Sequence, residues 1–153
     1  MLILALIYLT FISLGLPESL LGSSWPFMTA DFRVPVENAG YISMLISLGT
    51  IVSTLFSHRL VQKRGVGKIV SVSAATTAAA LFGISLAPSF LWLLLFALPL
   101  GLGSGAVDSA LNAFVAENYE ARHMNWLHSF WGLGTVLSPA LVSVLTSTGQ
   151  QWR

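Results

Sequence analysis

The distribution of charged residues constrains this chain more than any other feature. Four stretches contain no Asp, Glu, Lys or Arg, namely residues 1–17, 38–57, 69–107 and 124–152. A helix that spans a bilayer needs about 20 mainly apolar residues. The longest stretch is long enough for two such helices, with a break near Pro88. Charged residues make up 8% of the chain, whereas soluble domains carry about 25%. The sequence therefore predicts a multispanning membrane protein.

We expect an all-α, polytopic bundle of five helices. Their approximate ranges are residues 2–28, 40–57, 69–86, 91–115 and 123–148. The first residues lack both the positive region and the small-residue cleavage site of a signal peptide. The first helix is therefore expected to be a retained span.

Composition also excludes several classes of site. The chain has no cysteine, so disulfides, thiolate metal sites and thiol nucleophiles are ruled out. Its net charge is +1, and no basic stripe indicates nucleic-acid binding. We predict no cofactor, no metal and no nucleic acid, and we expect the lipid bilayer to be the main surrounding.

The Lys and Arg residues predict the orientation. Four of the seven fall in the segment 58–68, and Arg122 follows the fourth expected helix, whereas the loops after the first and third expected helices hold only Arg33. Cytoplasmic loops carry an excess of Lys and Arg. We therefore expect a multi-pass protein of the cell (plasma or inner) membrane with a cytoplasmic N-terminus.

A short phrase of the form Gly-x-x-acid-Ser-x-Leu occurs twice. The copies are Gly15-Leu-Pro-Glu18-Ser19-Leu-Leu21 and Gly105-Ala-Val-Asp108-Ser109-Ala-Leu111. A second pair of phrases is Leu48-Gly-Thr-Ile-Val-Ser53 and Leu133-Gly-Thr-Val-Leu-Ser138. The first helix thus matches the fourth, and the second matches the fifth. A period of three spans predicts an inverted repeat, a building principle of secondary transporters.

The two carboxyl groups of this phrase are the main candidates for function. An ionisable residue at membrane depth is expensive and usually faces a partner or a water-filled path. Asp108 shares a helix stripe with Asn112, and Asn125 and His128 share a face of the fifth helix. Asp108 and His128 are expected at similar depth, where they could touch. Glu18 and Asp108 are therefore predicted to carry protons.

An intramembrane enzyme is the competing interpretation of the glycine-rich run 101–105. Its Ser104, paired with His128, suggests a serine protease. The Gly-x-Ser-Gly phrase fails because Leu102 occupies its first place, and Val107 breaks the aspartyl-protease phrase Gly-x-Gly-Asp. We predict that the protein is not an enzyme.

Two longer segments resemble a known family. Residues 103–112 resemble the acid-x-x-x-Asn segment of the fucose:proton symporter family, which belongs to the major facilitator superfamily. Residues 125–139 resemble its Asn-Leu-x-x-x-Phe-x-x-x-Gly-x-x-x-x-Pro pattern, and Glu18 falls where that family places an acid. The resemblance implies twelve helices in two halves. Residues 1–153 would then be an incomplete amino-terminal six-helix half, and the carboxy-terminal half would be a missing partner.

The resemblance also implies an activity. It implies proton-coupled symport of a sugar or a similar small polar solute, with Asp108 and Glu18 as the titrating groups. Asn112, His128 and Trp131 would contact the solute, and Asn125 and Trp25, on polar helix faces, are further candidates.

The cytoplasmic loop departs from the superfamily signature Gly-x-Leu-x-Asp-Arg-x-Gly-Arg-Lys. His58 replaces the first Gly, Gln62 the Asp, and Val66-Gly67 the basic pair. The residues expected to form this gating loop are Arg59, Lys63, Arg64, Gly65 and Lys68. Two alternatives stay open: a drug or metabolite proton antiporter of the same superfamily, and a non-transporting membrane scaffold fragment.

Overall fold

The computed structural model describes residues 2–148 and 152. The elements are α1 (Leu2–Phe32), the short 3-10 helix η1 (Val36–Asn38), α2 (Ala39–Arg64), α3 (Val66–Ser85), α4 (Phe90–Asn118) and α5 (Ala121–Ser147). Among these described residues, five helices are long and apolar enough to cross a membrane. The predicted all-α class and the five helices able to span a membrane are confirmed.

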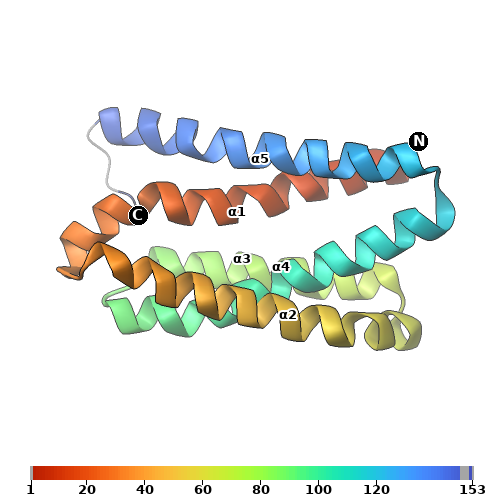
Figure 1. Ribbon diagram of the computed structural model, residues 1–153, viewed down its shortest axis with the longest axis horizontal. Coiled ribbons are helices and arrows are strands. Elements are labelled where there is room, and N and C mark those ends of the chain that lie inside the picture. Colours follow the sequence, from red (N-terminus) through yellow and green to blue (C-terminus); the bar gives the residue numbers. More distant parts are fainter. Residues whose placement is uncertain (1, 149–151, 153) are drawn as a thin grey trace. The chain divides into compact units, whose positions relative to one another are not determined.

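The helices form two compact units (Figure 1). The first, the α1–α5 unit, comprises residues 1–36 and 119–153, and the second, the α2–α4 unit, comprises residues 37–118. In the α1–α5 unit the two helices run parallel, because Tyr8 bonds to His123 while Leu16, further along, bonds to Ser138. Segments far apart in sequence therefore build one unit.

Helix α4 is the centre of the α2–α4 unit. It packs along both α2 and α3, which touch each other little. Within the apolar stretch of each helix, 44% of α4 is buried, compared with 11% of α2 and 22% of α3. Small residues explain this burial: Gly101, Gly103 and Gly105 lie where a neighbouring helix approaches the α4 backbone. Close approach over glycine is the usual way for membrane helices to associate.

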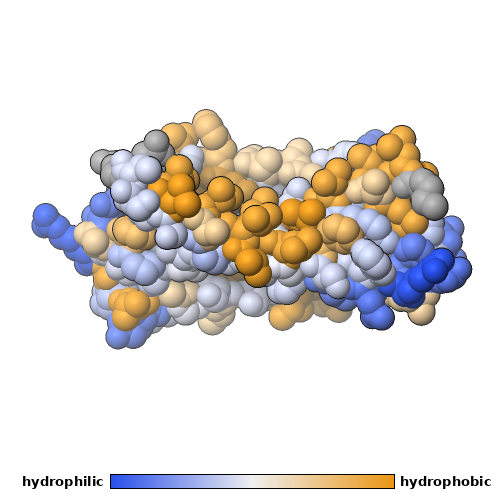
Figure 2. Space-filling view, turned by 90° about the horizontal axis from the view of Figure 1, so that it is seen from above, coloured by the Kyte–Doolittle hydropathy of each residue, from blue (hydrophilic) through white to orange (hydrophobic). Residues whose placement is uncertain are grey.

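The outer faces of the helices remain apolar. Large side chains such as Leu95, Val136 and Leu55 are 65%, 70% and 71% exposed. On the visible face, Figure 2 shows many apolar side chains along the middle of the helices and hydrophilic ones mainly towards helix ends. A water-soluble surface would not tolerate so many exposed large apolar groups. These faces suit contact with lipid.

The helices extend further than the sequence predicted, and the largest difference concerns the basic segment. The expected loop 58–68 is almost entirely helical, since α2 continues to Arg64 and α3 begins at Val66. Gly65 makes the connection with φ +81°, a conformation that glycine adopts without a Cβ clash. Its N–H donates to the carbonyl of Val61 over 2.8 Å. Lys, Arg and Gln are good helix formers. The polar composition of this segment was therefore compatible with helix and did not require a loop.

Prolines lie inside three of the helices without ending them: Pro17 and Pro26 in α1, Pro99 in α4 and Pro139 in α5. A proline has no N–H, so the carbonyl four residues earlier loses its helical donor. For Pro139 this carbonyl belongs to Thr135, and Ser19 of α1 donates its hydroxyl to it over 2.8 Å. A neighbouring helix thus satisfies the backbone group that the proline frees, as membrane helices require.

Candidate functional site

The contact between α1 and α5 depends on two glycines. A Cβ atom added at Gly15 would clash with the carbonyl group of Trp131, and one added at Gly134 would clash with the carbonyl group of Ile12. Both clashes involve backbone, which cannot rotate away as a side chain would. The two helices therefore touch through their main chains at this point.

The contact between α2 and α4 is built in the same way. A Cβ atom added at Gly101 would clash with the carbonyl group of Ile46, and one added at Gly49 would clash with the carbonyl group of Leu98. Each helix of the pair again contributes one glycine. These two helices are also parallel, because the contact positions rise together along both chains.

One serine adds the same hydrogen bond to each pair. Ser138 Oγ of α5 donates to the carbonyl of Leu16 in α1 over 2.8 Å. Ser53 Oγ of α2 donates to the carbonyl of Leu102 in α4 over 2.7 Å. Both serines are buried. Together, the glycines and the serines fix how α1 corresponds to α4 and how α5 corresponds to α2.

The repeat predicted from the sequence is therefore present in the packing. The equivalent positions are Ile12 and Leu98, Gly15 and Gly101, Leu16 and Leu102, Gly134 and Gly49, and Ser138 and Ser53. If all five helices span a membrane in chain order, α1 and α5 cross it in one direction, and α2 and α4 cross it in the other. Such an arrangement is an inverted repeat.

The register of the first and fourth helices differs from the sequence phrase. The phrase matched Gly15 to Gly105, whereas the packing matches Gly15 to Gly101, about one helical turn earlier. The second phrase, which matched Gly49 to Gly134, has the correct register. The predicted equivalence of Glu18 and Asp108 is therefore wrong by one turn.

The consequence is that the two carboxyls are not a symmetric pair. In the register of the packing, Glu18 corresponds to Ser104, and Asp108 corresponds to Gly22. Along its helix, Asp108 lies about one turn further beyond the contact glycine Gly101 than Glu18 lies beyond the contact glycine Gly15. Each carboxyl therefore has its own surroundings.

Asp108 is held by its neighbour on α4. Asn112 Nδ2 donates a hydrogen bond of 3.0 Å to Asp108 Oδ1, and the two residues lie on the same face of the helix, as their spacing of four predicted. Both side chains are half-buried. The carbonyl oxygen Oδ1 of Asn112 is buried without a hydrogen-bond partner among the described residues. A buried acceptor without a partner is costly, so this oxygen is the unsatisfied polar atom of the pair.

Ser104, one turn before Asp108 on α4, has a different role. Its buried hydroxyl donates to the carbonyl of Gly101 over 3.3 Å, within its own helix. Such a bond is the ordinary choice of serine inside a helix. It gives no support to Ser104 as a nucleophile.

Glu18 occupies an exposed position on α1. The neighbouring Ser19 turns towards α5 and bonds to Thr135. Trp25, two turns further, is 5% exposed, and its indole N–H donates to the carbonyl of Val36 over 2.8 Å. This bond gives Trp25 a structural role at the end of α1, and its contact with a solute stays a prediction.

The candidates on α5 lie on its exposed side. Asn125 and His128 are exposed, and Trp131 is 37% exposed. The ring of His128 meets the ring of Phe11 edge-on, with centroids 6.3 Å apart. Asp108 and His128 belong to different units, so their predicted contact stays a prediction.

The basic residues predicted to form a gating loop are all exposed at the junction of two helices. Arg59, Lys63 and Arg64 lie in the last turns of α2, and Lys68 lies in the first turn of α3. Only Gly65 lies outside helix. The loop itself is corrected to a helical hairpin, while a gating role for these residues stays a prediction.

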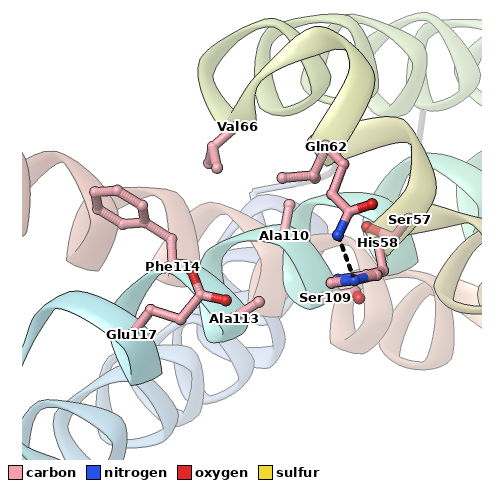
Figure 3. Close-up of a pocket in the computed structure, with 10 residues that line it drawn as sticks. Ser57, His58, Gln62, Val66, Ser109, Ala110, Ala113, Phe114 and Glu117 are labelled. Atoms are coloured by element: carbon pink, nitrogen blue, oxygen red, sulfur yellow. Dashed lines mark hydrogen bonds between the residues drawn. The ribbon is translucent and has the colours of Figure 1, made fainter.

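The sequence did not indicate two polar features. Tyr8 Oη and His123 Nδ1 form a hydrogen bond of 2.6 Å between α1 and α5. A cavity in the α2–α4 unit is lined by His58, Gln62 and Glu117 among others (Figure 3). The Tyr8–His123 bond joins two helices far apart in the sequence, and the cavity brings Glu117 of α4 beside residues of α2, so neither feature follows from spacing along one helix.

The fold defines a membrane protein built from repeated helix pairs, and a comparison with known families agrees. The model of the Major Facilitator Superfamily matches residues 7–153. The chain therefore belongs to this superfamily of transporters, whose members handle small-molecule solutes within a lipid membrane. This family indicates a transporter and not an enzyme.

Curated relatives show low identity to this chain. The uncharacterized MFS-type transporter YfkL of Bacillus subtilis is 26% identical over 141 residues, which cover 90% of this chain and 36% of the relative. The glucose/mannose transporter GlcP of Bacillus subtilis is 23% identical over 138 residues, covering 89% of this chain and 34% of the relative. The niacin transporter NiaP of Acinetobacter baylyi is 26% identical over 120 residues, covering 76% of this chain and 27% of the relative.

The chain thus spans about a third of the length of the first curated relatives it matches. No solved structure gives a significant match. The likeness to the fucose:proton symporter family stays a prediction within the superfamily.

Proposed function

We propose that this protein is a secondary active transporter that couples the uptake of a small polar solute to protons, with Asp108 as the proton-carrying group. The observation that carries the proposal is the bond between Asp108 and Asn112 inside the apolar helix α4. Carboxyls in such helices mark substrate or ion pathways. Membership of the superfamily supports transport as the activity.

The chemistry of the pair suggests how a proton and a solute are coupled. An ionised carboxylate only accepts hydrogen bonds, whereas a protonated one also donates. Protonation of Asp108 therefore changes which atoms of Asn112 it can bond. Asn112 Oδ1 has no partner among the described residues, so the amide can pass this change to a bound solute. A solute that donates a hydrogen bond suits this oxygen.

Sugars are the proposed solutes. The resemblance of residues 103–112 and 125–139 to a sugar symporter family supports this choice, as does the similarity to a glucose/mannose transporter. A niacin transporter is similar at comparable identity. Uptake of labelled hexoses and of labelled niacin into the same proteoliposomes separates these two solute classes.

The test is accumulation of the solute in proteoliposomes that contain the complete gene product, with an inward proton gradient. Asp108→Asn keeps the size and the hydrogen-bonding ability of the side chain but cannot carry a proton. We expect it to lose gradient-driven accumulation and to keep solute exchange. Glu37→Gln, in η1, is the control and should accumulate solute normally. Normal accumulation by Asp108→Asn would remove the assigned role.

Glu18 is proposed as a second, auxiliary proton group. Because its position is not equivalent to that of Asp108, we expect Glu18→Gln to change the rate of accumulation without abolishing coupling. Equal loss in both variants would contradict this difference. Solute that leaves the vesicle as protons enter would instead indicate the antiporter, and the absence of both transport and solute binding would indicate a scaffold.

We also propose that the protein lies in the cell membrane with its N-terminus in the cytoplasm. The basic residues at the junction of α2 and α3 support this orientation through the positive-inside rule. The chain has no cysteine, so single cysteines can be placed freely. Lys63→Cys should resist a membrane-impermeant thiol reagent in whole cells, and Asn38→Cys should react.

A further inference from the structure

A cavity of about 230 Å³ lies within the α2–α4 unit, near the junction of α2 and α3 (Figure 3). It is separate from the Asp108–Asn112 pair, since neither of these residues lines it. Its polar lining residues are Ser57, His58, Gln62, Ser109 and Glu117. Val61, Val66, Phe114 and two alanines complete its walls.

Ser57 shows that this cavity has a polar group to satisfy. The residue is 1% exposed, and its hydroxyl has no hydrogen-bond partner among the described residues. Serine and threonine in helices usually donate to a carbonyl of their own helix, as Ser71 and Thr76 do in α3. Leaving a buried hydroxyl without a partner costs stability. The hydroxyl of Ser57 is therefore placed to bond to whatever occupies the cavity.

One wall of the cavity is formed by two side chains that bond to each other. Gln62 Nε2 and His58 Nε2 are 2.9 Å apart and form a hydrogen bond between successive turns of α2. Figure 3 shows this bond across one side of the cavity.

Glu117 supplies the charge of the cavity. In the part of the chain that the structure describes, it is the one lining residue with a carboxylate, and no Lys or Arg lines the cavity. Among the described residues, no ion pair joins Glu117 to a cation. In Figure 3, Glu117 and Ser57 are set apart, with Ala113 and Ala110 between them. The cavity therefore offers an anionic group at one end and a hydroxyl at the other.

We propose that this cavity binds an ammonium group joined through a short chain to an oxygen. The ammonium donates to the Glu117 carboxylate, and the oxygen bonds to the Ser57 hydroxyl. The volume suits such a group, since one water occupies about 30 Å³ of liquid and the cavity is several times larger. Charge-assisted hydrogen bonds of this kind are about twice as strong as neutral ones.

Two sources share this chemistry: a free amino alcohol and the headgroup of an aminophospholipid. Ethanolamine is titrated by calorimetry into the protein in nanodiscs of phosphatidylcholine alone. Native mass spectrometry on nanodiscs of mixed phosphatidylethanolamine and phosphatidylcholine measures which lipid is retained. Binding of ethanolamine indicates the free source, and selective retention of phosphatidylethanolamine indicates the lipid. Choline lacks N–H groups, so it should bind at least several-fold more weakly than ethanolamine.

The variants test the two ends of the cavity separately. Glu117→Gln removes the charge at nearly constant size, and we expect it to weaken binding about tenfold or more. Ser57→Ala should weaken it about threefold to tenfold. Glu120→Gln is the matched control, because Glu120 lies outside the cavity and pairs with Arg122 over 3.1 Å. Its binding should be unchanged.

Three outcomes would overturn the proposal. The first is equal binding of the amine by Glu117→Gln and by the parent protein, and the second is equal binding of choline and ethanolamine. Absence of binding from both sources would mean that the cavity holds water alone. Circular dichroism spectra of each variant show whether a loss of binding reflects lost folding. If Glu117→Gln misfolds, Glu117→Asp takes its place, because it keeps the charge and should keep binding. None of these readouts depends on transport through Asp108.

Discussion

The α1–α5 pair and the α2–α4 pair solve the same packing problem with different sequences. Each pair crosses in parallel over one glycine from each helix, and each adds one hydrogen bond from a buried serine to a carbonyl. The pairs differ in what lies beyond the crossing. Helix α4 continues to Asp108 and Asn112, whereas the matching positions of α1 are Gly22 and Pro26.

This difference teaches that a packing repeat and a functional repeat are separate properties. The backbone contacts require small residues at fixed positions, so both copies keep them. The carboxyls make no part of those contacts, so nothing in the packing forces them to coincide. The Asp108 site is therefore a property of the α2–α4 unit and has no counterpart at the equivalent position of α1.

The largest effect on folding is expected at the glycines of the two crossings. Gly15→Leu and Gly101→Leu each place a side chain against a backbone carbonyl. We expect each to lower the free energy of unfolding by about 3 kcal/mol or more, measured by denaturant titration in micelles. Gly132→Leu on α5 is the control, since a Cβ there meets nothing within 4 Å. Tolerance of only one of the two variants would break the equivalence of the crossings.

A smaller effect separates the two serines that the sequence phrase had matched. Ser19→Ala leaves the Thr135 carbonyl without a donor because Pro139 has no N–H, so we expect a loss of about 1–2 kcal/mol. Ser109→Ala should change the free energy of unfolding little, since Ser109 lines a cavity. Pro139→Ala restores the N–H, and the cost of Ser19→Ala should shrink in that background. Equal costs for both serines would favour the register of the phrase.

The smallest effect concerns the serines that the packing matches. Ser53→Ala and Ser138→Ala each remove one hydrogen bond between helices, and each should cost about 1 kcal/mol. Their costs should agree within a few tenths of a kcal/mol. Ser129→Ala, an exposed serine that bonds within its own helix, should cost less. Unequal costs at Ser53 and Ser138 would show that the two crossings differ in energy despite their common geometry.

Much of the fold was predictable because it depends on properties of single helices. Runs without charge predicted five helices able to span a membrane, and the spacing of Asp108 and Asn112 predicted that they share one face of their helix. The helix ends were less predictable. The polar segment 58–68 lies beyond the apolar run of α2, yet its residues are good helix formers, and only Gly65 interrupts it.

The site could be predicted only in part, for the same reason. Candidates on one helix follow from its periodicity, as for Asp108. Tyr8 with His123, or Ser57 with Glu117, come together only when two helices pack. Their separations in sequence carry no pattern that a single helix would impose.

The sequence by itself determined that this chain is a helical membrane protein with a duplicated pair of helices and carboxyls inside apolar spans. The tertiary structure decided the register of that duplication and the cavity beside Ser57. The physical reason is the spacing of glycines in α4. Gly101 and Gly105 lie one turn apart, so Gly15 can be aligned with either glycine, and the acid and serine that follow favoured Gly105. The contact of Gly101 with the Ile46 carbonyl, which matches that of Gly15 with the Trp131 carbonyl, selects Gly101.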